Sequence, residues 1–173
     1  ALRLQRDEGG LGSEHHAKHQ QHQRARVPGV ADVAEAMMLT EAGLEATYVV
    51  LSPARPEHAR ALIAYGCEPV VCNGDMVEAI SREAEQAGKR IAIHLKVDTG
   101  MGRVGIRPDA VRSFLDRCQE LKGLELRGLM SHFARADEAD KAFSLEKRLC
   151  SVEAAGASEA YPEIPLRRAG KRY

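Results

Sequence analysis

The regular alternation of strand-like and helix-like segments from Val27 onward constrains the fold of this chain more than any other feature. Short apolar runs typical of buried strands are followed by longer segments whose apolar residues recur at helical spacing. Consecutive parallel strands need a long crossover, which is usually a helix. The alternation therefore predicts an α/β protein with parallel strands. We expect strands at residues 27–30, 48–51, 70–71, 90–98 and 124–133. The helices expected between and after them lie within residues 32–43, 56–65, 73–88, 108–123 and about 138–149.

These elements make about five β-α units, and both a doubly wound sheet and a (β/α)8 barrel fit such a series. The steady, short repeat of these units favours the barrel. Five units cannot close an eight-stranded barrel. The expected fold is therefore a partial (β/α)8 TIM-type barrel that lacks the first and last strands.

The composition divides the chain into three zones. Residues 1–26 hold four of the seven histidines and no Ile, Val or aromatic residue. Their His-rich run is compatible with a metal-binding tract, but the composition favours a disordered or non-native segment. We expect residues 27–150 to form the barrel domain and residues 151–173 to form an irregular tail with a basic end.

Charge and hydropathy exclude several classes of partner. The 25 Lys and Arg residues balance 25 Asp and Glu residues, so nothing favours a nucleic-acid or anionic-membrane partner. No apolar run is long enough to span a bilayer, and the N-terminus lacks the apolar core of a secretory signal. The four cysteines have no metal-type spacing, and we expect Cys67 and Cys118 to be buried. These features indicate a cytoplasmic protein without a metal site.

The stretch from His94 to Gly105 is the richest in candidate functional groups. Strand alternation puts Lys96 on the same face as His94. A lysine in an apolar strand must find a partner or lose its proton, and an ion pair with Asp98 is the plainest solution. Arg103 lies in the glycine-rich loop that follows, where a barrel carries its catalytic groups. Its planar donors suit a carboxylate or phenolate, although a surface arginine in a turn also fits the spacing.

A second stretch, from Gly128 to Glu138, contains His132 at the end of the last clear strand. Regular alternation would place His132 on the face shared by Leu126, Gly128 and Met130. A position beyond the carboxyl end of a strand favours a functional role, whereas a core or loop histidine is the alternative.

Together the two stretches resemble the alanine racemase family. The first matches its pattern His-Leu-Lys-x-Asp-Thr-Gly-Met-x-Arg-x-Gly, and the second matches Gly-Leu-x-(Ser/Thr)-His-Phe-Ala-x-Ala-Asp. The resemblance extends from about Val27 to Leu149. It implies a PLP (pyridoxal 5'-phosphate)-dependent isomerase that interconverts L-alanine and D-alanine for peptidoglycan synthesis, with a homodimer as the intact enzyme.

The resemblance also implies roles for three residues. Arg103 matches the arginine beside the phenolic oxygen of PLP and the substrate carboxylate. Lys96 matches a lysine that is often carbamylated and pairs with that arginine. His132 matches the histidine that lines the cofactor pocket.

The departures from the family limit what this chain can do alone. The family attaches PLP to a lysine in a segment similar to Val-Lys-Ala-Asn-Ala-Tyr-Gly-His-Gly, and residues 1–26 contain no counterpart. The family's tyrosine base belongs to a further β domain, and its Ala-Asn-Ser segment is replaced by Ala169-Gly170-Lys171. We therefore assign no catalytic residue, and we expect the chain alone to be inactive. The alternatives are a related PLP-barrel racemase for serine or another small amino acid, and a catalytically inactive fragment.

Overall fold

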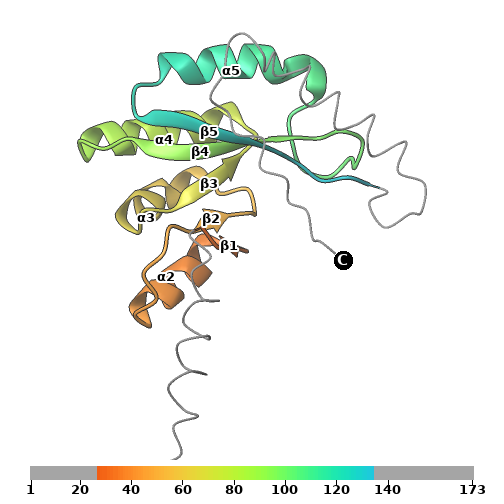
Figure 1. Cartoon of the computed structure of the whole chain (residues 1–173). Coiled ribbons are helices and arrows are strands. Elements are labelled where there is room, and N and C mark those ends of the chain that lie inside the picture. Colours follow the sequence, from red (N-terminus) through yellow and green to blue (C-terminus); the bar gives the residue numbers. More distant parts are fainter. Residues whose placement is uncertain (1–26, 135–173) are drawn as a thin grey trace, which may run out of the picture.

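The computed structural model describes residues 27–134, which form a five-stranded parallel sheet flanked by helices (Figure 1). The strands lie in the order β1-β2-β3-β4-β5, which is also their order along the chain. A doubly wound sheet reverses its strand order at one point, whereas a barrel does not. The sequential order therefore confirms the partial barrel. The strands are β1 Gly29–Val30, β2 Val49–Val50, β3 Glu68–Val71, β4 Ile91–Val97 and β5 Leu124–Ser131.

The helices occupy the expected crossovers. They are α2 Val33–Glu41, α3 Ala59–Ala64, α4 Gly74–Gln86 and α5 Val111–Glu120, with 3-10 turns at Pro56–His58 and Pro108–Ala110. The segment expected as one helix from 56 to 65 thus begins with a 3-10 turn. Figure 1 shows helices α2 to α5 spaced along the sheet in chain order.

Local signals explain where helices α2 and α4 begin. The Asp32 side chain accepts a hydrogen bond from Glu35 N at 3.0 Å, and the Asn73 side chain accepts one from Met76 N at 2.9 Å. Both residues are the expected N-caps. The Glu35 carboxylate reaches back to Ala31 N, at 2.6 Å, rather than to Asp32 N as a regular capping box would.

The hydrophobic core lies between the helices and the face of the sheet that we call the outer face. On β4 this face carries four apolar residues that are all buried, and it packs against apolar side chains of α4 and α5. Cys67 and Cys118 are buried as expected, and burial raises the pKa of Cys118 to about 11. The opposite, inner face of β4 carries the polar residues. The outer-face residues of β4 are Ile91, Ile93, Leu95 and Val97.

Strand β5 contains a β-bulge that the sequence pattern did not predict. Its register against β4 pairs Ile93 with Leu126 but His94 with Gly128, so Arg127 is an extra residue. Leu126 consequently packs into the core on the outer face. The expectation that Leu126 shares a face with Gly128, Met130 and His132 is therefore wrong.

Several expectations lie beyond the described residues. These are the helix at 138–149 and the character of residues 1–26 and 151–173, which stay predictions. Among residues 27–134, no helix has the length and apolarity that a membrane crossing requires.

Candidate functional site

The candidate site is built on the carboxyl ends of β4 and β5 and on the loop that follows β4. Asp98 organises this loop with its carboxylate. One of its oxygens accepts hydrogen bonds from Gly100 N at 2.9 Å and Gly102 N at 3.1 Å, and the other accepts one from Arg103 N at 3.1 Å. The backbone hydrogen bond from Gly100, aided by others in the loop and opposed by burial, holds the pKa of Asp98 below its ordinary value.

The same loop folds back onto the end of its own strand. Asp98 N donates to Ile106 O at 2.9 Å, and Ile106 N donates to Lys96 O at 2.8 Å. Gly105 has φ 140°, and a Cβ at that position would lie 2.4 Å from Asp98 N, so only glycine fits there. The loop that carries Arg103 is therefore fixed at both ends.

Arg103 and Lys96 lie at the same end of β4, but the ion pair expected between Lys96 and Asp98 is not present. The Arg103 side chain is exposed, and within residues 27–134 no hydrogen bond or ion pair joins its guanidinium group or the Lys96 ammonium to another residue. The ion pair between Lys96 and Asp98 does not form, because the loop amides occupy the Asp98 oxygens. Lys96 is partly buried on the inner face and pairs with Met130 across the strands.

His132 follows directly after β5 and is exposed. Two hydroxyl groups hold the neighbouring strand ends together. Ser131 Oγ donates to Val97 O at 2.9 Å and lies 2.8 Å from Thr99 Oγ1, which is therefore the donor in that pair. Thr99 is only 5% exposed. Sequence reasoning assigned no role to Thr99 and Ser131, although both lie inside the two motifs.

Cys72, directly after β3, also borders the site. Burial raises the pKa of its thiol, while the Gly105 backbone N–H and the positive charge of Lys96 oppose that rise. Cys72 thus lies beside both the loop and Lys96. In the described range no group of three or more His, Cys, Asp or Glu side chains is arranged to hold a metal ion.

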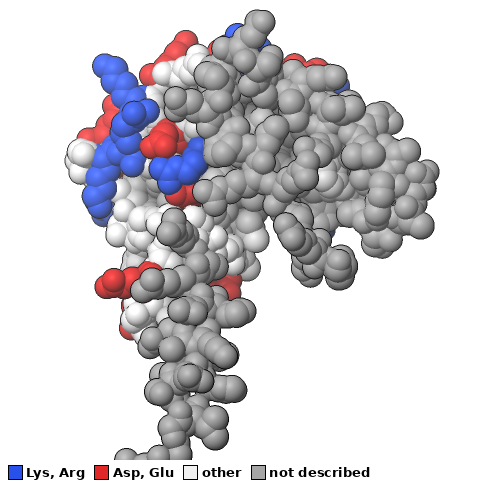
Figure 2. Space-filling model, in the orientation of Figure 1, with Lys and Arg blue, Asp and Glu red and all other residues white. Residues whose placement is uncertain are grey.

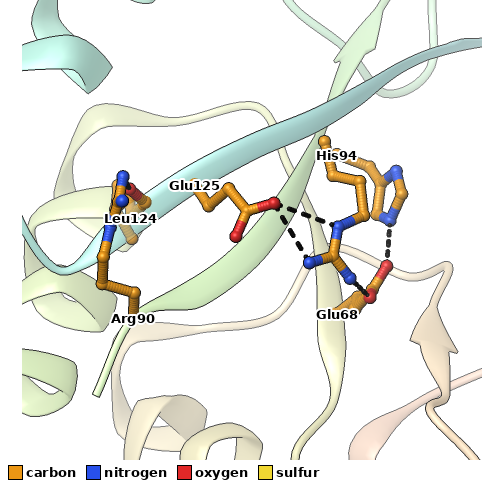
Figure 3. A network of polar contacts seen from close by, with 6 residues as sticks. Glu68, Arg90, His94, Leu124 and Glu125 are labelled. Atoms are coloured by element: carbon orange, nitrogen blue, oxygen red, sulfur yellow. Dashed lines mark hydrogen bonds and ion pairs between the residues drawn. The ribbon is translucent and has the colours of Figure 1, made fainter. Parts of the chain in front are cut away.

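A polar cluster lies on the inner face, nearer the amino ends of the strands. Figure 3 shows its members Glu68, His94 and Glu125 near one another. The residue Glu68 is 3% exposed, and its carboxylate contacts His94 Nε2 at 2.8 Å and forms an ion pair with Arg127. Arg127 also pairs with Glu125 at 3.1 Å. Sequence reasoning missed this cluster, because Glu68 and Arg127 are 59 residues apart in the chain.

The outer surface carries several ion pairs, so basic and acidic side chains alternate there. Arg117 bridges α5 and α4 through Glu78 at 2.8 Å, and Arg112 pairs with Asp116 at 3.2 Å. Figure 2 shows basic and acidic side chains next to one another on the described part of the visible face. That part of the surface therefore presents no single-sign patch of the kind that steers a polyanion.

Comparison with known proteins identifies the family. Residues 6–170 match the family model described as "Alanine racemase, N-terminal domain". The alanine racemase of Halothermothrix orenii is 36% identical over 118 residues, which are 68% of this chain and 31% of that enzyme. The chain spans about a third of the length of the curated relatives it matches.

Solved structures share the fold. An alanine racemase of Clostridium difficile superposes with a TM-score of 0.73 and 24% identity, over 86% of this chain and 39% of that one. A histidine racemase of Leuconostoc mesenteroides superposes with a TM-score of 0.69 and 19% identity, over 90% of this chain and 41% of that one. The family model matches nearly the whole sequence, and both structural likenesses place the five strands in the same type of barrel. The chain belongs to the alanine racemase N-terminal domain family.

Proposed function

We propose that this chain is part of the PLP-binding barrel of a racemase that interconverts L-alanine and D-alanine. One observation carries the proposal. Lys96 and Arg103 come from one family motif and His132 from the other, and the fold brings all three to the carboxyl ends of two neighbouring strands. The carboxyl ends of barrel strands are where this architecture carries its active sites.

The donors at this end of the sheet suit pyridoxal 5'-phosphate. Arg103 extends an exposed guanidinium group from a fixed loop, and its planar donors fit an anionic phenolic or carboxylate oxygen. His132, exposed at the next strand end, supplies a further polar ring. When bound, PLP accepts the negative charge that develops at the α-carbon of the amino acid. This chain's residues would bind and orient the cofactor and the substrate carboxylate.

We further propose that Lys96 carries a carbamyl group in the intact enzyme. An ammonium group beside the Arg103 guanidinium would repel it, whereas a carbamate would accept its hydrogen bonds. Two contacts support this proposal. The Asp98 carboxylate oxygens accept hydrogen bonds from loop amides and so do not pair with Lys96, and Ile106 N donates to Lys96 O and holds the loop against that strand. Lys96 would thereby act through Arg103 as a positioning residue.

The proton transfers are assigned to other parts of the complete polypeptide, and no residue of this chain is given that role. In the family a lysine that holds PLP and a tyrosine from the partner subunit perform them, so we propose a homodimer. A cytoplasmic location and a role in peptidoglycan synthesis complete the proposal. A related racemase for serine or another small amino acid is the second candidate, since the barrel is shared with a histidine racemase and does not fix the substrate.

Complementation of a D-alanine-requiring bacterium with the complete reading frame tests this function. The parent gene should restore growth without added D-alanine, and Arg103→Ala should not. Arg107→Ala is the matched control, because Arg107 is an exposed arginine in the same region that pairs with Asp109 at 2.7 Å. Growth with Arg103→Ala as good as with Arg107→Ala would contradict the assignment of Arg103, and failure of the parent gene would contradict the function.

A further inference from the structure

The bulge in β5 reverses which residues of that strand face the inner side of the sheet. Leu126 and Leu129 both pack against the core on the outer face although they are three residues apart. Residues of a regular strand share a face only at even spacing, so an extra residue must lie between them. The register identifies Arg127 as that residue.

The position of the candidate site depends on this reversal. Leu124 lies on the outer face, opposite Ile91. Without the extra residue, alternation from Leu124 would keep Gly128, Met130 and the following His132 on the outer face, among the helices. With it, Gly128 pairs with His94 and Met130 pairs with Lys96, both on the inner face.

Contacts on the inner face hold Arg127 in the bulge. Its guanidinium group forms ion pairs with the carboxylates of both Glu68 and Glu125, and Glu68 is almost fully buried. A buried carboxylate is stable only when it is paired and hydrogen-bonded. The next residue, Gly128, leaves the space that the His94 ring fills, since a Cβ there would lie 2.8 Å from His94 Nδ1.

We propose that Arg127 is a positioning residue whose pairing with Glu68 and Glu125 fixes the bulge, and thereby turns Met130 and His132 to the same side of the sheet as Lys96. The link to His132 as a cofactor contact rests on the proposed function. The effect on strand register does not, and it can be measured without any activity.

Disulfide cross-linking in the full chain reads the register directly. In the bulged register Lys96 is the Cα partner of Met130, whereas a strand without the bulge would bring Leu129 opposite Lys96. Paired positions on neighbouring strands lie within the Cα separation that a disulfide tolerates. The two reporters are Lys96→Cys with Met130→Cys and Lys96→Cys with Leu129→Cys, both made with Cys72→Ser because Cys72 is close to Lys96. Mass spectrometry after mild oxidation gives the yield of each.

We expect the Met130 reporter to dominate in the parent, and its excess over the Leu129 reporter to fall by about tenfold with Arg127→Val or Glu68→Gln. Arg127→Lys, which keeps one cation, should recover part of the excess. Deletion of Arg127 should restore the excess of the Met130 reporter. Removing the extra residue leaves residue 130 opposite residue 96 in a strand without a bulge. The proposal would be overturned if the ratio of the two cross-link yields stayed at the parent value in both Arg127→Val and Glu68→Gln. It would also be overturned if deletion of Arg127 lowered that ratio as Arg127→Val does. If the cross-links behave as expected but the complete enzyme does not racemise alanine, only the proposed function fails.

Discussion

At the residue scale, Asp98 shows how one carboxylate can organise the loop of the candidate site. It accepts hydrogen bonds from three backbone amides, including that of Arg103, so the backbone position of the arginine depends on it. Its pKa is lowered chiefly by the Gly100 hydrogen bond. A carboxyl with a lowered folded-state pKa stabilises the fold above its unfolded pKa, about 3.9, and that stability is lost as the pH falls through the folded-state pKa.

Asp98→Asn should therefore remove a pH-dependent part of the stability. Asparagine keeps one acceptor oxygen, so we expect a loss of about 1 kcal/mol in the free energy of unfolding at neutral pH. Below about pH 4 the parent should lose stability faster than the variant, and the two curves should converge. Denaturant unfolding across this pH range measures the difference. Parallel curves for the two proteins would contradict the role of Asp98.

In the complete enzyme, acetate should restore part of the racemisation rate lost with Lys96→Ala but not the rate lost with Arg103→Ala. Lys96→Ala should slow racemisation by roughly tenfold to a hundredfold, the value of a charge-assisted hydrogen bond lost at the transition state. Millimolar acetate should partly restore the rate by filling the vacated anion position. Arg103→Ala should be slower still and should not respond to acetate. Full activity of Lys96→Ala, or an unmodified Lys96 in a native mass spectrum of the parent enzyme at neutral pH, would refute the carbamylated role.

At the scale of elements, the parts that were predictable from sequence are those with local signals. Strand β4 and helix α4 have clear periodicities, and Asn73 and Gly88 mark where α4 begins and ends. The motifs also placed the candidate residues at the ends of β4 and β5, where the structure has them. The β5 bulge was not predictable, because it is defined by packing against β4 and by the distant Glu68. Simple alternation therefore assigned Leu126 to the wrong face.

Gly128→Ala tests the close packing of β5 on β4. The new Cβ would lie 2.8 Å from His94 Nδ1, so the ring must move, and we expect a loss of about 1–3 kcal/mol in the free energy of unfolding. Gly74→Ala is the control, because a Cβ there meets nothing within 4 Å and it lies in helix α4. In a double-mutant cycle, His94→Ala should absorb most of the Gly128→Ala penalty. Additive losses would show that the ring is not the cause.

At the scale of the whole molecule, five sequential parallel strands make up part of a barrel that closes with eight. The chain supplies the loop with Arg103 and the strand end with His132, while the family's PLP-bearing lysine has no counterpart motif among its residues. Under the proposed function, this segment would contribute to binding, and the proton transfers would be performed by other parts of the complete polypeptide.

The 173-residue chain alone should accordingly bind PLP only reversibly. Borohydride treatment of its mixture with PLP, followed by mass spectrometry, should leave its lysines unmodified at stoichiometric PLP. Lys96 is the residue to inspect first, because it belongs to the candidate site. Stoichiometric reduction onto one lysine of this chain would show that the attachment point had been missed.

The most direct test of the central claim is to follow L-alanine in deuterated water with the complete polypeptide and PLP, by proton NMR and chiral chromatography. The account predicts that D-alanine forms while the α-proton is replaced by deuterium, that Arg103→Ala slows both processes together, and that alanine is converted faster than serine. No D-alanine from a folded, PLP-loaded parent enzyme would contradict the account, and faster conversion of serine would favour the second candidate function.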